Sequence, residues 1–261
     1  MTESIVFKAG DYRYLPAVFQ YSAGVAAEPG YVLEQARFLK PLPLSEAYRA
    51  VEKHLERLGR PSTAFAHCEL RTPQQFDDQG FIEFNREYVK TLENWGIYQP
   101  EGKTAEGTPL AAINPVARTN VCPQYFKPDA MAMFAFTYTL PTDSGMRSFM
   151  LSGGGEARQG SEPYRERIAA FGDTSAAGLR TKLDVVLREM SERLRSLGFG
   201  WDDVTTAHLY SVQDMGALVG EVLAKHGHIP GGITWHCARP PVSGLEVEMD
   251  LRGAVRQIFI A

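Results

Sequence analysis

The sequence has few cysteines, and none of them stands at a spacing typical of a site. Its 261 residues include only Cys68, Cys122 and Cys237, which lie far apart. Because neither a Cys-x-x-Cys pair nor a Cys/His ligand spacing occurs, the sequence predicts no structural zinc site and no disulfide framework. We therefore expect no metal, and no cofactor is implied. A reducing, cytoplasmic location fits best.

The chain also lacks an excess of positive charge, a long apolar run and a low-complexity tail. Its 27 Lys and Arg residues are outnumbered by 31 Asp and Glu residues, for a formal net charge of -4. This balance argues against a nucleic-acid partner. No apolar run approaches the length of a membrane span, and residues 1–4 lack the features of a signal peptide, so we expect no membrane association.

What the sequence does contain is one order of elements that occurs twice. In each copy a helix ends at a Leu-Gly pair, at Gly59 and again at Gly198, and a strand with an Ala-His pair follows, at His67 and at His208. A second helix comes next, and further strands close each copy. A repeat of this size predicts two similar domains that pack together and can build one site between them.

The pattern of apolar residues predicts a mixed fold. Helical spacing recurs at 45–59, 81–92, 173–197 and about 215–225, and strands are indicated at 117–125, 131–140, 148–152, 204–212, 234–238 and 245–251. A turn cluster at 141–145 marks a boundary. We therefore predict an N-terminal domain, 1–143, and a C-terminal domain, 144–261. Each would be an α+β domain, a mainly antiparallel sheet with two helices on one face.

Three stretches carry a resemblance to the RidA/YjgF superfamily. Residues 203–214 look like the family's strand and following turn, and residues 245–250 (Leu-Glu-Val-Glu-Met-Asp) are similar to its closing strand. Residues 115–121 (Pro-Val-Ala-Arg-Thr-Asn-Val) are close to its Pro-Ala-Arg-Ser/Thr signature. The resemblance implies two fused RidA/YjgF-like (chorismate-mutase-like) domains. The two-copy layout also resembles the chorismatases, in which a Cys-Arg pair like that at 237–239 precedes the last strand.

The resemblance assigns an arginine and a glutamate to the site. The imine-hydrolysing members hold the substrate carboxylate with the signature arginine and position a water with a glutamate of the closing strand. These residues map to Arg118 in the first copy and to Glu248 in the second. The second copy has no arginine at 230–233, and the first copy's strand 131–139 has no acid. Neither copy has a complete pair, which indicates that the two copies have specialised.

Both residues also have a structural interpretation. Glu248 shares one face of its predicted strand with Glu246 and Asp250, which is typical of the solvated face of a half-buried strand. As a catalyst it would instead act as an acid/base or hold a water, with a pKa raised by burial. Arg118 could equally serve a structural ion pair.

Arg239 is the second candidate for the carboxylate site. In a continuous strand Trp235, Cys237 and Arg239 would project the same way, and a guanidinium can grip a carboxylate with two hydrogen bonds. The alternative is a surface arginine at a strand end. Cys122 and Cys237 are more typical of small buried hydrophobes than of nucleophiles.

The remaining candidates would form the walls of the site. In the family the glycine turn after a strand lines the ligand pocket, so the backbone N–H groups of Gly153 and Gly154 are expected to bind polar oxygens. Tyr210 and Trp235 would supply pocket walls, although aromatic residues in strands are usually part of the core.

Together these observations predict a small-molecule enzyme that acts on a small organic acid. The first hypothesis is a deaminase that hydrolyses an imine or enamine, with Glu248 as acid/base or water holder and Arg118 or Arg239 on the carboxylate. A chorismatase-like lyase or hydrolase that releases pyruvate is one alternative. A non-catalytic ligand-binding protein that kept the fold is the other. The resemblance also implies a homo-oligomer with trimer-like packing.

Overall fold

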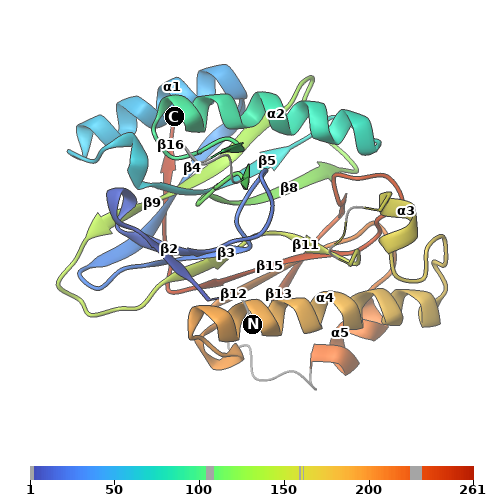
Figure 1. Ribbon diagram of the computed structural model, residues 1–261. Helices are drawn as coiled ribbons and strands as arrows, with labels where there is room; N and C mark the ends of the chain where they lie inside the picture. Colours follow the sequence, from blue (N-terminus) through green and yellow to red (C-terminus); the bar gives the residue numbers. More distant parts are fainter. Residues whose placement is uncertain (1–2, 104–108, 159, 161, 224–230) are drawn as a thin grey trace.

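Two β-sheets lie face to face, and helices cover the outer face of each (Figure 1). A computed structural model describes residues 3–103, 109–158, 160, 162–223 and 231–261. Of the predicted elements, the end of the helix at about 215–225 and position 230 fall outside these ranges. No helix in the described ranges is long and apolar enough to cross a membrane.

The first sheet, called sheet 1, lies under helices α1 and α2. Its strand order is β14 (Ala238–Arg239), β8 (Ala117–Pro123), β5 (Phe65–Arg71), β9 (Ala132–Pro141), β4 (Tyr31–Pro43) and β16 (Arg256–Ile260). The helices are α1 (Leu44–Arg57) and α2 (Asp78–Asn94). Ala47, Val51 and Leu55 of α1 are buried at helical spacing against the sheet, as the sequence predicted. Asp77 caps α2 by accepting the N–H of Gly80.

The second sheet, called sheet 2, lies over helices α4 and α5. Its order is β1 (Ile5–Phe7), β2 (Tyr12–Leu15), β3 (Gly24–Ala27), β10 (Phe149–Leu151), β15 (Glu248–Gly253), β12 (Thr206–Tyr210) and β13 (Ile233–His236), and β11 (Gly154–Gly155) also pairs with β15. The helices are α4 (Ala176–Leu197) and α5 (Gly216–Leu223). Ser175 caps α4, and Gly198 ends it at a φ of 78°, which confirms the predicted limits of this helix.

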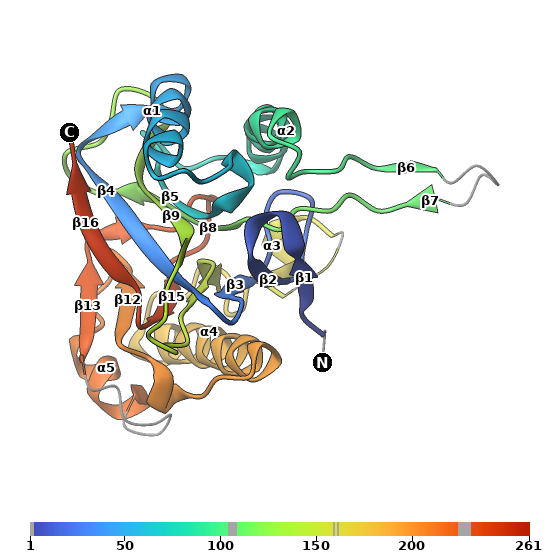
Figure 2. The same cartoon turned by 90° about the vertical axis from the view of Figure 1, so that its left-hand side faces the viewer.

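Short elements join these layers. They are the 3-10 turns η1 (Lys8–Gly10), η2 (Ser62–Ala64) and η3 (Trp201–Asp203), the short helix α3 (Tyr164–Arg167), and the paired strands β6 (Gly102–Lys103) and β7 (Pro109–Leu110). Figure 2 shows β6 and β7 extending away from the two sheets.

The two sheets exchange strands across the predicted domain boundary. Strands β1 to β3 come from the beginning of the chain but belong to sheet 2, whereas β14 and β16 come from its last part but belong to sheet 1. β16 lies beside β4 (Figure 2). The two strands are parallel, with Arg256 opposite Glu34. The division into 1–143 and 144–261 stays a prediction, and each sheet contains strands from both sides of it.

Two predicted strands differ from the observed ones. The closing strand begins at Glu248, and all of β15 is buried, because one face packs on α4 and the other faces sheet 1. The run 234–238 is divided: β13 pairs with β12 in sheet 2, whereas β14 pairs with β8 in sheet 1. Since the chain crosses between sheets at Cys237, the prediction that Trp235, Cys237 and Arg239 project the same way is wrong.

Candidate active site

A cavity of about 520 Å³ lies between the two halves of the chain. Its lining comes from the loop between β2 and β3, from α2 and β8, from the glycine turn before β11, from the segment around α3, from α4, and from the chain leading into β15. Strands of both sheets therefore present side chains to one shared cavity, as the repeat predicted.

Four of the predicted site residues line this cavity, and four do not. Arg118, Gly153, Gly154 and Glu248 line it. The residues that lie elsewhere are Tyr210, Trp235, Cys237 and Arg239. The arginine of the first copy and the glutamate of the second thus share one cavity, and the pair that neither copy holds alone is complete between them.

Arg118 is held in an aromatic cage. The side chain projects from β8 and is 2% exposed, and its guanidinium carbon lies 4.9 Å from the ring centre of Tyr21 and 4.7 Å from that of Tyr88. Among the described residues its Nη1 atom has no hydrogen-bond partner. A buried guanidinium nitrogen without a hydrogen-bond acceptor is unfavourable unless a ligand supplies one. The geometry therefore suits a ligand carboxylate rather than a structural ion pair.

The backbone of Arg118 is fixed from the other sheet. Its N–H donates to Oγ of Ser152 at 2.9 Å, and its carbonyl accepts the N–H of Gly153 at 3.1 Å. These two hydrogen bonds join β8 to the glycine turn, so they fix the position of the Arg118 backbone relative to the turn.

Glu248 lies buried against the glycine turn. A β carbon on Gly153 would overlap with Oε1 of Glu248 and lie 2.9 Å from its Cδ, so the carboxyl occupies the space that a side chain at 153 would need. Burial and, second, the charge of Asp250 raise the pKa of Glu248 well above its ordinary value, although Arg193 and Arg118 lower it. A carboxyl of this kind holds its proton and can act as a general acid.

Gly154 serves the packing of α4 beside the cavity. A β carbon there would lie 2.6 Å from Cε of Met190 and 3.3 Å from the guanidinium nitrogens of Arg193. Arg193 donates to the carbonyl of Ser152 at 2.8 Å and to Oε1 of Glu189 at 2.6 Å. Glycine is therefore needed at both positions, because Glu248 occupies the side-chain space at 153 and Met190 and Arg193 occupy that at 154.

Among the lining residues that the sequence did not predict, Tyr21 and Arg193 lie next to the central pair, Arg118 and Glu248. Tyr21 lies in the loop between β2 and β3, outside the three stretches that resemble the RidA/YjgF superfamily. It contacts Arg118 only through the tertiary fold. Burial, first, and neighbouring Tyr164 raise the pKa of the Tyr21 phenol, which keeps its proton and can donate it in a hydrogen bond. Arg193 lies in α4, whose sequence is typical of an ordinary amphipathic helix. Its neighbours along the chain therefore do not indicate that it lines a cavity.

The lining carries more positive than negative side chains. Five arginines line the cavity (Arg86, Arg118, Arg158, Arg167 and Arg193), against four acids (Asp78, Glu162, Glu189 and Glu248). The raised pKa of Glu248 favours its neutral form, which adds to this positive excess. In a chain with a net charge of -4 this local excess attracts anions.

The other predicted residues have partners outside the cavity. Arg239 pairs with Glu246 at 3.4 Å, so its guanidinium binds a carboxylate of the protein itself. Trp235 is 43% exposed and donates its Nε1–H to the carbonyl of Ser211. Cys237 is exposed. These positions lie outside the cavity because the strand that should have aligned them is divided between the sheets.

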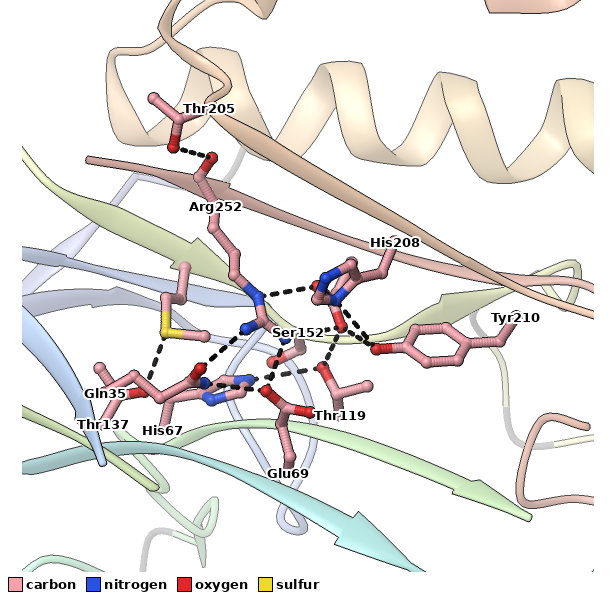
Figure 3. A network of polar contacts seen from close by, with 12 residues as sticks. Gln35, His67, Glu69, Thr119, Thr137, Ser152, Thr205, His208, Tyr210 and Arg252 are labelled. Carbon is pink, nitrogen blue, oxygen red and sulfur yellow. Dashed lines mark hydrogen bonds and ion pairs between the residues drawn. The ribbon is translucent and has the colours of Figure 1, made fainter. Parts of the chain in front are cut away.

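Tyr210 belongs to a buried polar network between the sheets (Figure 3). Its hydroxyl donates to Oδ2 of Asp250 at 2.8 Å. Arg252 donates to the same carboxylate and, at 2.7 Å, to Oε1 of Glu69 from sheet 1. The face that carries Glu248 and Asp250 is therefore buried against sheet 1 and is not the solvated surface that the alternating pattern allowed.

Strand register explains why the described residues do not form a second site of this kind. The residue after the histidine of each Ala-His pair lies opposite Arg118 in sheet 1 and opposite Trp235 in sheet 2. The second residue after each histidine lies opposite Ala135 in sheet 1 and opposite Glu248 in sheet 2. The repeat thus places a tryptophan where the other copy has its arginine, and an alanine where the other copy has its acid.

No group of three or more His, Cys, Asp or Glu side chains within the described ranges is arranged to hold a metal ion.

Comparisons with known proteins agree with the predicted fold and chemistry. A family described as 2-aminomuconate deaminase CnbZ matches residues 4–258. The 2-amino-5-chloromuconate deaminase of Comamonas testosteroni is 58% identical over 262 residues, which cover 100% of both chains. A chorismatase structure has a TM-score of 0.53 at 14% identity, over 89% of this chain and 77% of that one. The YjgF gene product of E. coli has a TM-score of 0.31 at 13% identity, over 43% and 83%. The predicted α+β fold is confirmed.

Proposed function

Since the chain belongs to the 2-aminomuconate deaminase CnbZ family, and is a deaminase-type enzyme acting on a small organic acid, we propose that its substrate is an unsaturated dicarboxylate of the 2-aminomuconate type. Such a substrate carries an amino group on the carbon next to one carboxylate. The observation that carries the proposal is that Arg118 and Glu248, from different halves of the chain, line one cavity.

Arg118 binds the carboxylate next to the amino group. Its Nη1 is buried and unpartnered among the described residues, and a guanidinium offers two parallel hydrogen bonds to a carboxylate. Phe81 and Tyr164, which also line the cavity, give flat apolar surfaces for the conjugated carbon chain. The second carboxylate reaches toward Arg86 and Arg158, which are exposed lining residues.

Glu248 moves the protons. Its carboxyl protonates the carbon next to the amino-bearing one, which turns the enamine into an iminium ion and leaves Glu248 as a carboxylate. That carboxylate takes a proton from water as the water oxygen bonds to the iminium carbon, giving a carbinolamine. Glu248 then protonates the nitrogen, the C–N bond breaks, and the proton of the new hydroxyl returns to Glu248. Overall, the enamine and one water give a 2-oxo acid and ammonia.

The test is the rate of ammonia release from 2-aminomuconate by purified protein. We expect Glu248→Gln to lower kcat by about 10² to 10⁴, which is the usual contribution of general acid–base catalysis. Glu246→Gln is the matched control, because Glu246 precedes Glu248 by two residues, lies outside the cavity lining, and pairs with Arg239. If Glu248→Gln kept the wild-type rate, Glu248 would not be the acid.

A cytoplasmic location is also part of the proposal. Cys68, Cys122 and Cys237 are all free thiols, which suits a reducing compartment. The homo-oligomer with trimer-like packing stays a prediction from the resemblance.

A further inference from the structure

Asp250 is a buried carboxylate that the proposed reaction does not use. It follows Glu248 by two residues on β15, so both side chains project from the same face of the strand. Asp250 is fully buried, and four side chains hold its oxygens: Tyr210 at 2.8 Å, Thr119 at 3.0 Å, Arg252 at 3.2 Å and His208 at 3.3 Å. Figure 3 shows these four side chains converging between the sheets.

The bond from Thr119 joins the two strands that carry the site. Thr119 follows Arg118 on β8 of sheet 1, and its hydroxyl donates to Oδ2 of Asp250 on β15 of sheet 2. Because neighbouring residues of a strand point to opposite faces, Thr119 faces sheet 2 while Arg118 turns into the aromatic cage under α2. The hydrogen bond from Thr119 to Asp250 therefore connects the strand that carries Arg118 to the strand that carries Glu248.

Asp250 also remains charged. Burial alone would raise its pKa, but Arg252 and His208 hold it well below its ordinary value. Arg252 itself lies between Asp250 and Glu69, and the Nε2 atom of buried His67 lies 3.4 Å from Oγ1 of Thr119. A buried charge cluster of this size is seldom the most stable way to fill a core, which indicates a role other than stability.

The charge of Asp250 acts on Glu248 together with groups from several elements. Asp250 on β15 and Glu156 in the segment after β11 favour the protonated carboxyl. Arg193 on α4 and Arg118 on β8 favour the carboxylate. Tyr21, from the loop between β2 and β3, faces the same space as a neutral phenol. After burial itself, Asp250 is the largest of these influences.

We propose that Asp250 is a positioning residue for the deaminase site: through Thr119 it fixes the strand of Glu248 to the strand of Arg118, and it holds a buried negative charge two residues from Glu248 on the same strand face. This inference rests on the proposed function, because it takes Glu248 as the acid. The hydrogen bond from Thr119 and the negative charge of Asp250 can be removed by separate substitutions.

The charge is tested by Asp250→Asn and the pH profile of kcat/KM for 2-aminomuconate. Asparagine can still accept the hydrogen bond from Thr119 but carries no charge. The proton of Glu248 should then be lost at lower pH, and the alkaline decline of activity should move down by about one pH unit or more. A folded Asp250→Asn protein with the wild-type profile would overturn the charge assignment.

The geometry is tested by Thr119→Val, with Thr119→Ser as its control. Valine has nearly the shape of threonine and leaves Asp250 charged, so we expect kcat to fall about 10-fold without a shift of the pH profile. Serine restores the hydroxyl and should restore the rate. Equal rates in the valine and serine variants would overturn the positioning role, and this pair decides the question even if Asp250→Asn does not fold.

Glu248→Gln in the same assay separates the two proposals. An inactive Glu248→Gln protein beside wild-type behaviour of the Asp250 and Thr119 variants would refute the role of Asp250 alone. An active Glu248→Gln protein would refute the proposed function itself.

Discussion

The carboxyl of Glu248 lies on Gly153, in the space that a β carbon at that position would occupy. The acid of the closing strand and the glycine turn after β10 are therefore one structural unit. We expect Gly153→Ala to displace the carboxyl and lower kcat by about 10- to 100-fold while the protein remains folded, since a misplacement of about 1 Å can cost that much. Gly102→Ala is the control, because nothing lies within 4 Å of a β carbon at that exposed glycine. Equal kcat values for the two variants, measured at saturating substrate, would contradict the contact.

Arg118 should affect ligand binding more than it affects the stability of the free protein. Its guanidinium is buried without an acidic partner among the described residues, so Arg118→Met should leave the melting temperature of the free protein unchanged or higher. Muconate, a dicarboxylate without the amino group, should stabilise the wild type by about 2.7 kcal/mol at 100 times its Kd. This stabilisation should be absent in Arg118→Met and reduced in Arg118→Lys. A full muconate shift in Arg118→Met, seen by calorimetry, would place the carboxylate elsewhere.

The buried acid predicts a pH-dependent stability. The pKa of Glu248 is higher in the folded protein than in the unfolded chain. Its contribution to stability is therefore present below the unfolded pKa of about 4.5 and is lost as the pH rises through the folded pKa. Glutamine has no proton to lose, so Glu248→Gln should melt at a higher temperature than the wild type at pH 9 and at a similar temperature at pH 4. The idea fails if the difference in melting temperature is the same at both pH values.

The exchange of strands predicts that the two halves of the chain depend on each other. A fragment of residues 1–143 lacks β14 and β16 of sheet 1, and a fragment of 144–261 lacks β1 to β3 of sheet 2. Each fragment alone should give the poorly dispersed amide NMR spectrum of an incompletely packed chain, and mixing or co-expressing them should restore dispersion. A folded spectrum from either fragment alone would show that the boundary at 143 separates independent domains.

Sequence patterns were sufficient to predict the order of the elements and the two central residues of the site, Arg118 and Glu248. Capping and apolar spacing predicted α4, and the stretches that resemble the RidA/YjgF superfamily predicted the two site residues. The repeat also predicted that the two copies could build one site between them, but it did not predict which copy would supply which residue to the shared cavity. Here the strand register places the arginine in one copy and the acid in the other.

Tertiary geometry accounts for the residues that were missed or misplaced. Tyr21 enters the cavity from a loop, and nothing in its neighbours along the chain signals the contact with Arg118. Arg239 was the second candidate because one continuous strand through 235–239 would align it with Trp235 and Cys237. The crossing at Cys237 sends it to the edge of sheet 1, where it pairs with Glu246. A period-two pattern cannot reveal that a strand changes sheets.

The sequence left two alternatives to a deaminase, a chorismatase-like enzyme and a non-catalytic ligand-binding protein. The chorismatase shares the fold at 14% identity, and that likeness says nothing of pyruvate release. The relative at 58% identity is a deaminase, which supports an enzyme over a ligand-binding protein without catalysis.

The parallel pairing of β16 with β4 links the folding of the two halves. Sheet 1 takes most of its strands from the early part of the chain, yet its edge is completed only by residues 256–260. Until those residues are in place, the backbone N–H and C=O groups along one side of β4 have no strand to pair with, and such an open edge can pair with another chain. The last strand therefore also protects the first half of the chain from aggregation.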